Sequence, residues 1–206
     1  IESEEVIDVF QMAGIERFDI SIINDDFLAS AKEKKTGREL KLELIRQIIN
    51  DEIKVRYPKN LIKYRKLKEE VEKVINDYHN HFFDSLIALE KLRQVAKEMQ
   101  EEDVRRTQLG LSDEEEAFYE ILAKHKTAIV DFELIKEIVK EITASIKKNL
   151  QIDWFKKPDA RAQIMLAVRK VLQKKGVTAE LKEIMDDIME QAEARYREWW
   201  GEEGVA

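Results

Sequence analysis

The fold of this chain is decided by one aromatic and charged stretch between two amphipathic segments, Ile152-Asp153-Trp154-Phe155-Lys156-Lys157-Pro158-Asp159-Ala160-Arg161. Side chains such as Ile152, Trp154 and Phe155 are costly to leave in water, so we expect this connection to pack into the core or against a partner. Pro158 suits the first turn of a helix, where its missing N–H group is no loss. The stretch therefore predicts a buried loop that leads directly into a helix.

A helix that begins at Pro158 places a cation among apolar side chains. Arg161 shares a face with residues three, four, seven and eleven positions further on, namely Ile164, Met165, Val168 and Leu172. A cation on such a face needs a partner, and Asp153 is the nearest candidate in the sequence. We therefore predict a structural ion pair between Asp153 and Arg161.

Most of the chain on either side of this stretch has the apolar periodicity of amphipathic helices. Residues 59–109 contain no Gly or Pro, and a single helix over this range would be about 75 Å long. Poor helix formers cluster in residues 76–81, so we expect a break near Asn80 and two long antiparallel helices. Ser112-Asp113-Glu114-Glu115 is a capping box, and Asp131 precedes the clearest amphipathic pattern in the chain.

The predicted fold class is all-α, an irregular multi-helix bundle of about seven to nine helices. One short exception is predicted near residues 19–23, where Asp19-Ile20-Ser21-Ile22-Ile23 alternates in the manner of an extended segment. We expect residues 1–24 to form an opening helix and this extended segment, continuing from an upstream domain. Residues 25–200 are expected to form the helical domain, and residues 201–206 a disordered tail.

Composition narrows the classes of protein that fit. The chain has 206 residues with six Gly, two Pro and no Cys, which favours helices and excludes disulfides and thiolate chemistry. Its formal charge of −7 argues against a nucleic-acid clamp. No apolar run approaches the ~20 residues of a membrane span, and no signal sequence opens the chain. We expect a fragment of a longer cytoplasmic polypeptide that does not contact a membrane.

The sequence shows no catalytic or cofactor-binding constellation. None of the six glycines belongs to a phosphate-binding Gly-x4-Gly-Lys-Ser/Thr loop, and no His follows a Glu at three residues. His79 and His81 lie two residues apart, which on a helix turns them about 200° away from each other. We therefore favour surface histidines over a metal site and expect no metal ligand here.

One motif match is misleading. Pro158-Asp159 followed by Glu180-Leu181-Lys182 fits the Pro-Asp…Glu-x-Lys signature of a large group of nucleases. In those enzymes the acids lie at the ends of neighbouring strands and hold a divalent cation. Here both acids fall at predicted helix starts, where they are expected as partners of the helix dipole, so we interpret the match as chance.

The helix that follows Trp154 is strongly basic. Residues 156–175 carry seven Lys or Arg side chains against one acid, a local charge of +6. Lys156, Lys170 and Lys174 fall on its polar side and are the candidates for phosphate contacts. A solvated cationic face that complements the acidic remainder is the favoured interpretation.

Five stretches taken together resemble the C-terminal helical region of the R (restriction) subunit of type I restriction enzymes. They are Asp8–Leu28, Lys41–Asn60, Asp77–His81, Ser112–Tyr119 and Ile152–Leu172. The third resembles a Tyr-His-Asn-Arg element, from which His81 departs. The order and spacing of the five cover nearly the whole chain.

The resemblance implies a non-catalytic module of a larger subunit. In that family the R subunit is an ATP-driven DNA translocase and endonuclease, and its nuclease and motor domains lie upstream. ATP and Mg²⁺ would therefore serve the parent subunit, with no cofactor in this region. The module would dock the subunit onto the methyltransferase and specificity subunits, brace the motor domains, and meet DNA through the complex. Trp154, Trp199 and Trp200 are the candidate core or docking aromatics.

Two alternatives stay open. The chain could be a freestanding helical adaptor for protein interactions, which predicts a Met start just upstream. It could also be a helical DNA-contacting module that uses the basic helix Lys156–Lys175, which predicts salt-sensitive binding. The DNA sequence recognised, the docking surface and the oligomeric state do not follow from the sequence.

Overall fold

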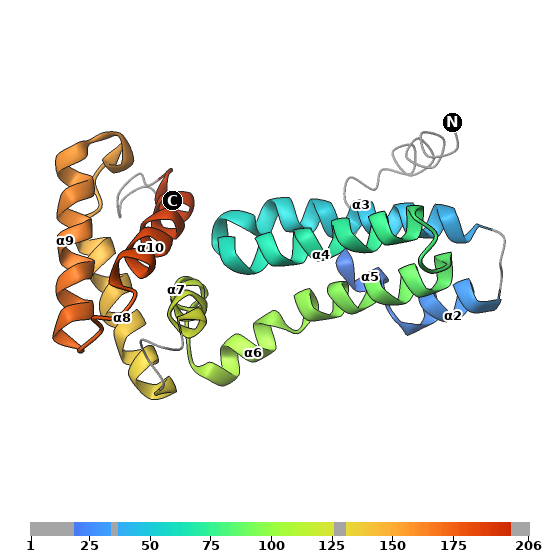
Figure 1. Ribbon diagram of the computed structural model, residues 1–206, viewed down its shortest axis with the longest axis horizontal. Coiled ribbons are helices and arrows are strands. Elements are labelled where there is room, and N and C mark those ends of the chain that lie inside the picture. The colour runs from blue at the N-terminus through green and yellow to red at the C-terminus, as the bar shows by residue number, and fades with distance from the viewer. Residues whose placement is uncertain (1–18, 34–36, 126–130, 199–206) are drawn as a thin grey trace. The chain divides into compact units, whose positions relative to one another are not determined.

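The computed structural model describes residues 19–33, 37–125 and 131–198. These residues form nine α-helices, labelled α2 to α10, and three short 3-10 helices, with no strand among them (Figure 1). The predicted all-α class is therefore confirmed. The chain divides into two compact units, residues 1–56 with 64–105 and residues 57–63 with 106–206.

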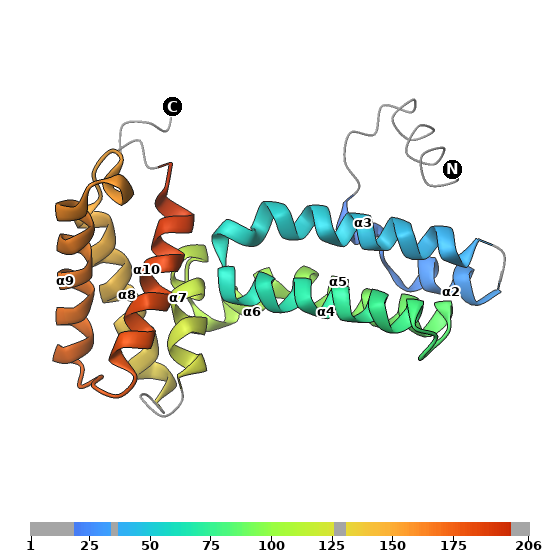
Figure 2. The same cartoon turned by 45° about the horizontal axis from the view of Figure 1, so that its top comes forward.

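The first unit contains a short 3-10 helix and four α-helices. They are η1 (Ile20–Ile22), α2 (Asp25–Glu33), α3 (Arg38–Arg56), α4 (Leu61–His79) from its second turn onward, and α5 (Ser85–Gln100). Helix α3 packs against α5, and α2 also packs against α5. The chain reverses direction between α4 and α5, as Figures 1 and 2 show. The predicted antiparallel pair of long helices is thus present, and a separate helix, α6 (Glu102–Leu109), follows it.

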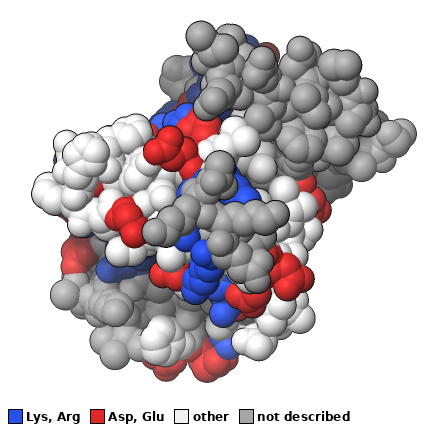
Figure 3. All heavy atoms as spheres, turned by 90° about the vertical axis from the view of Figure 1, so that its right-hand side faces the viewer, with Lys and Arg blue, Asp and Glu red and all other residues white. Residues whose placement is uncertain are grey.

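Helical periodicity explains the core of the first unit. The apolar stripe of α4 is buried from Tyr64 to Val74, with Tyr64, Leu67 and Val71 at most 2% exposed. Helices α3 and α5 turn their own stripes inward, and Ile45, Ile49, Leu89 and Leu92 have no solvent exposure. On the end of this unit that carries α2, acidic and basic side chains are interspersed on the surface (Figure 3).

The extended segment predicted near residues 19–23 is wrong, because residues 20–22 form the 3-10 helix η1. The Asp19 side chain accepts a hydrogen bond from the N–H of Ser21 at 2.7 Å and opens this turn. Ile20 and Ile23 are buried, whereas Ile22 is 36% exposed. A spacing of three places the first two on one side of a 3-10 turn. The spacing of three between Ile20 and Ile23 therefore indicates the 3-10 turn, and the alternating pattern of residues 19–23 was misleading.

The second unit is a four-helix bundle. It contains η2 (Tyr57–Lys59), the end of α6, α7 (Asp113–Lys124), α8 (Phe132–Asn149), η3 (Trp154–Lys156), α9 (Pro158–Lys174) and α10 (Leu181–Tyr196). Helix α8 packs against α7 and α9, and α10 closes the bundle by packing against the same two helices. Figure 2 shows the four helices side by side.

One hydrophobic core fills the second unit. Its members include Phe118, Ile138, Ile142, Trp154, Ile164, Leu172 and Ile188, none of which is exposed to solvent. Helix α8 contributes a continuous apolar stripe from Ile135 to Ile146. The side chains of η3 and α9 complete the core that α8 helps to form.

Local sequence signals set several helix ends. The predicted capping box of α7 is present, since Ser112 Oγ accepts from the N–H of Glu115 while the Glu115 side chain accepts from the N–H of Ser112. Asp131 caps α8 through the N–H groups of Glu133 and Leu134. Pro158 occupies the first turn of α9 as predicted. The domain boundaries predicted at residues 24 and 200 stay predictions, because the opening helix before residue 19 and the tail after residue 198 lie outside the described residues.

Candidate docking surface and polar network

Trp154 is a core residue that fastens η3 to the end of α10. It has no solvent exposure, and its Nε1–H donates to the backbone carbonyl of Tyr196 at 2.9 Å. Buried Trp side chains need such a partner for the indole N–H. The neighbouring Phe155 is half-buried against the same core. Trp154 and Phe155 of the loop quoted at the outset therefore pack inward as predicted, whereas Ile152 is 59% exposed and the prediction is wrong for it.

The predicted ion pair between Asp153 and Arg161 is replaced by two other pairs. Arg161 Nη1 lies 2.6 Å from Glu193 Oε2 on α10, and Asp153 pairs with Lys156 Nζ at 3.0 Å. Arg161 has a carboxylate partner, as its position on the helix predicts, but this carboxylate comes from α10 and not from Asp153. This partner is 32 residues away in the sequence, so proximity along the chain pointed to the wrong acid.

The lysines predicted to contact phosphate differ in whether an acidic side chain pairs with them. Lys174 pairs with Glu141 at 3.6 Å, and its neighbour Lys175 pairs with Glu137 and Glu141 at 3.1 and 2.9 Å. Hydrogen bonds to Glu141 and Glu137 raise the pKa of Lys175 above its usual value. Lys156 carries its own pair with Asp153. Acids of α8 and of the η3 loop thus offset part of the +6 charge of this segment.

Lys170 and its neighbour Arg169 are exposed on the outer face of α9. Neither forms an ion pair within the described part of the chain. The basic segment is therefore a mixed surface, in which Lys156, Lys174 and Lys175 are paired with acids while the central cations Arg169 and Lys170 are solvated.

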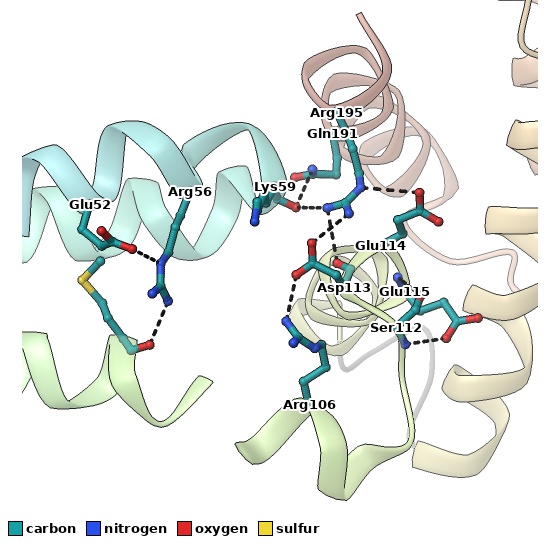
Figure 4. A network of polar contacts seen from close by, with 11 residues as sticks. Glu52, Arg56, Lys59, Arg106, Ser112, Asp113, Glu114, Glu115, Gln191 and Arg195 are labelled. Atoms are coloured by element: carbon teal, nitrogen blue, oxygen red, sulfur yellow. Dashed lines mark hydrogen bonds and ion pairs between the residues drawn. The ribbon is translucent and has the colours of Figure 1, made fainter. Parts of the chain in front are cut away.

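A polar network holds residues 57–63 against α7 and α10 (Figure 4). Its centre is Gln191, which is 1% exposed. The Gln191 side chain accepts from the N–H of Leu61 at 2.7 Å and donates to the carbonyls of Pro58 and Lys59, both at 3.1 Å. The side-chain amide thus satisfies the first N–H group of α4 and two carbonyls of η2.

An arginine and an aspartate extend this network. Arg195 Nη2 donates to Asp113 Oδ2 at 2.9 Å, and Arg195 Nη1 also reaches the Lys59 carbonyl at 3.3 Å. The other oxygen of Asp113 accepts from Arg106 Nη1 at 2.8 Å. Asp113 therefore binds one guanidinium group from α6 and one from α10.

Electrostatics keep Asp113 charged. Partial burial alone would raise its pKa, but the hydrogen bond and charge of Arg195 outweigh this effect. The charges of Lys59 and Arg106 act in the same direction, so the pKa lies below the usual value for an aspartate.

In the first unit Arg56 has a similar bridging role, since it binds Glu52 and donates to the carbonyl of Met99 at 3.0 Å.

A second polar cluster joins α7 to α10. His125, at the end of α7, is 7% exposed. Its Nδ1 lies 2.5 Å from Glu180 Oε2 and its Nε2 lies 3.3 Å from Asp187 Oδ2. Lys124 also binds Asp187, at 3.0 Å. The cluster ties the C-terminal end of α7 to the first two turns of α10.

The nuclease-like motif has a helical setting in the structure. Asp159 lies in the first turn of α9, and Glu180 precedes α10 with a left-handed backbone (φ 51°). The contact of Glu180 with His125 gives that carboxylate a structural partner. Among the described residues, no group of three His, Cys, Asp or Glu side chains is arranged to hold a metal ion.

Sequence reasoning missed Gln191, Arg195 and His125. The available signal was the pattern of α10, where Gln191 and Arg195 lie three and seven residues after the buried Ile188. Polar groups beside an apolar stripe indicate a buried hydrogen-bond partner. The identity of that partner, the η2 segment, required the fold. Trp199 and Trp200, predicted as docking aromatics, lie outside the described residues.

None of the helices in the described residues is long and apolar enough to cross a membrane.

Residues 1–198 match the family described as type I restriction enzyme HindI endonuclease subunit-like, C-terminal. No solved structure matches the chain.

Two curated relatives are similar over most of the chain. One is the type I restriction enzyme HindI endonuclease subunit of Haemophilus influenzae, 33% identical over 84% of this chain and 17% of that protein. The other is the putative type I restriction enzyme MjaIXP endonuclease subunit of Methanocaldococcus jannaschii, 30% identical over 95% of this chain and 19% of that protein. The chain thus spans less than a fifth of the length of either relative. It belongs to the family of C-terminal regions of HindI-like endonuclease subunits of type I restriction enzymes.

Proposed function

We propose that this chain is a non-catalytic assembly module of a type I restriction enzyme in the cytoplasm. It docks the endonuclease subunit onto the methyltransferase–specificity core and braces the motor domains of the same subunit. The observation that carries this proposal is the family match over residues 1–198, which corresponds to the C-terminal part of a much longer subunit. In this proposal ATP, Mg²⁺ and the nuclease chemistry belong to other parts of that subunit, and DNA is reached through the complex.

The architecture supports a bracing role. Two compact helical units are built on separate sets of buried side chains, and the side chains of Gln191, Arg195 and Asp113 fasten residues 57–63 within the second unit. Each closely packed unit of this kind transmits force without large movement within itself. Catalytic roles are not needed to explain any of these contacts.

The test is a binding measurement between this chain and a reconstituted methyltransferase–specificity core from the same source. We expect a complex that survives size-exclusion chromatography at moderate salt. A chain that is folded by circular dichroism and yet fails to bind the core would contradict the assembly role. Binding of the chain to isolated motor domains, measured in parallel, tests the bracing role separately.

A further inference from the structure

One exposed surface of the second unit combines an aromatic ring with three cations from three elements. It consists of Phe155 and Lys156 from η3, Arg161 from α9 and Arg197 just after α10, and we call it the Phe155 surface. We propose that the Phe155 surface is a docking site for a carboxylate-bearing segment of a partner protein. This inference rests on the proposed assembly function and names the surface and the chemistry that it uses.

The two arginines of this surface share one carboxylate. Arg161 Nη1 lies 2.6 Å from Glu193 Oε2, and Arg197 Nη2 lies 2.8 Å from Glu193 Oε1. One carboxylate balances only one of the two guanidinium charges. A guanidinium group can bind two oxygens at once through its planar fork of N–H groups. The pair is therefore set up to accept a second carboxylate from outside.

The ring of Phe155 holds two cations in place. Lys156 Nζ and Arg197 Cζ each lie 5.2 Å from its centroid, within the range of cation–π attraction. The side chain of Arg197 is nevertheless 59% exposed and that of Lys156 is 65% exposed. Cations that are already oriented lose less conformational entropy when a ligand binds, so this arrangement favours recognition.

The base under this surface is rigid. Trp154, the residue before Phe155, donates its indole N–H to the carbonyl of Tyr196, the residue before Arg197. Both Trp154 and Tyr196 are buried, at 0% and 4% exposure. This hydrogen bond ties the chain at Phe155 to the chain at Arg197. Trp154, one of the candidate docking aromatics, is therefore buried and contributes to the proposed docking surface only through the chain that it anchors.

Charge distinguishes a protein ligand from a nucleic-acid backbone. The surface has three cations, but Glu193 and Asp153 contribute two carboxylates that contact them. The successive phosphates of a nucleic-acid backbone would be repelled by these two acids. A single carboxylate, in contrast, needs only one cation whose charge is not already balanced. Ile152, just before Asp153 in the chain, is 59% exposed and adds an apolar contact. Arginine and aromatic side chains beside apolar area are typical of protein interfaces.

The test compares charge-reversal variants of the complete chain for binding to the reconstituted methyltransferase–specificity core. Arg197→Glu is expected to weaken the affinity at least about tenfold, and Arg197→Lys by less, because lysine keeps the charge but loses the planar fork. Lys156→Glu gives an independent reversal that leaves the arginine pair intact. Arg169→Glu is the matched control, since Arg169 is also exposed, lies on α9 and is outside the surface.

Each outcome has a separate meaning. If the wild-type chain binds the core while Arg197→Glu and Lys156→Glu bind equally well, the Phe155 surface is wrong and the assembly role stands. If the folded wild-type chain does not bind the core, the assembly role fails and this inference fails with it. A duplex DNA of about 30 base pairs serves as the second probe. Loss of DNA affinity in Arg197→Glu with unchanged core binding would overturn the protein ligand in favour of phosphate.

Discussion

The side-chain oxygen of Gln191 accepts a hydrogen bond from the backbone N–H of Leu61 at 2.7 Å, although the two residues are 130 positions apart. Leu61 is the first residue of α4, and the first N–H groups of a helix have no partner within the helix. The same amide donates to the carbonyls of Pro58 and Lys59. A side-chain amide suits this position because it accepts and donates at once.

The first prediction concerns the loss of this amide. Gln191→Leu keeps a similar volume but removes all three hydrogen bonds and leaves one N–H and two carbonyl groups without them. We expect a loss of about 3 kcal/mol in the free energy of unfolding, since each buried orphan group costs about 1–3 kcal/mol and some will reach water. The measurement is urea unfolding followed by circular dichroism.

Gln173→Leu is the matched control for this change. Gln173 is exposed on α9, so the same substitution there should alter the free energy of unfolding by less than about 0.5 kcal/mol. Equal effects at the two positions would show that the η2 segment does not depend on Gln191.

The second prediction concerns acid stability. The pKa of Asp113 is lowered in the folded chain by Arg195, Lys59 and Arg106. A lowered folded pKa means that the stabilisation is present above the unfolded pKa of about 3.9 and is lost as the pH falls through the folded pKa. Because the Asp113 side chain is 38% exposed, solvent screening limits the effect.

Asp113→Asn tests this linkage. The variant keeps the shape of the side chain and removes its charge, so we expect lower stability than wild type at pH 7 by about 1–2 kcal/mol. The difference should shrink below about pH 4, where the wild-type carboxylate also becomes protonated. Thermal unfolding between pH 2.5 and 7 measures it. A gap between the two proteins that is independent of pH would mean that charge is not the cause.

The sequence predicted local features well because their causes lie within a few residues. The capping box at Ser112 and the first-turn proline Pro158 each depend on neighbours in the chain, and both are present. The ion pair of Arg161 was misassigned because its partner, Glu193, comes from a helix that only the packing brings near. The role of Gln191 was missed for the same reason. Which polar residues become partners over a long distance in the sequence depends on how the helices pack. The apolar stripes alone do not determine that packing.

The third prediction concerns Trp154. Trp154→Phe removes the indole N–H, leaves the carbonyl of Tyr196 without this donor, and opens a small cavity in the core. We expect a loss of about 2–3 kcal/mol in the free energy of unfolding. Phe82→Leu is the control, since Phe82 is 75% exposed and its truncation should cost less than about 0.5 kcal/mol. If Trp154→Phe is as mild as the control, the indole hydrogen bond contributes little to the anchoring of η3.

The last prediction compares two helix ends that share one geometry. At the end of α4 the N–H of Phe82 binds the carbonyl of Asp77 and the N–H of His81 binds that of Tyr78, both at 3.0 Å. The same pattern ends α9, with Gly176 in the position of His81. Both residues have a left-handed backbone, with φ of 59° for His81 and 78° for Gly176. Only glycine adopts this conformation without a steric cost.

Reciprocal substitutions should therefore have opposite signs. His81→Gly relieves a cost of about 1–2 kcal/mol but gives the unfolded chain more freedom, which takes back about 0.4–1 kcal/mol. We expect a net gain of about 0.5–1 kcal/mol and slower amide hydrogen exchange at the end of α4. Gly176→Ala should lose about 1 kcal/mol, and no atom lies within 4 Å of the added Cβ, so backbone strain alone accounts for the loss. If His81→Gly is destabilising instead, the imidazole makes a contact that outweighs its backbone strain, and this turn is held by its side chain.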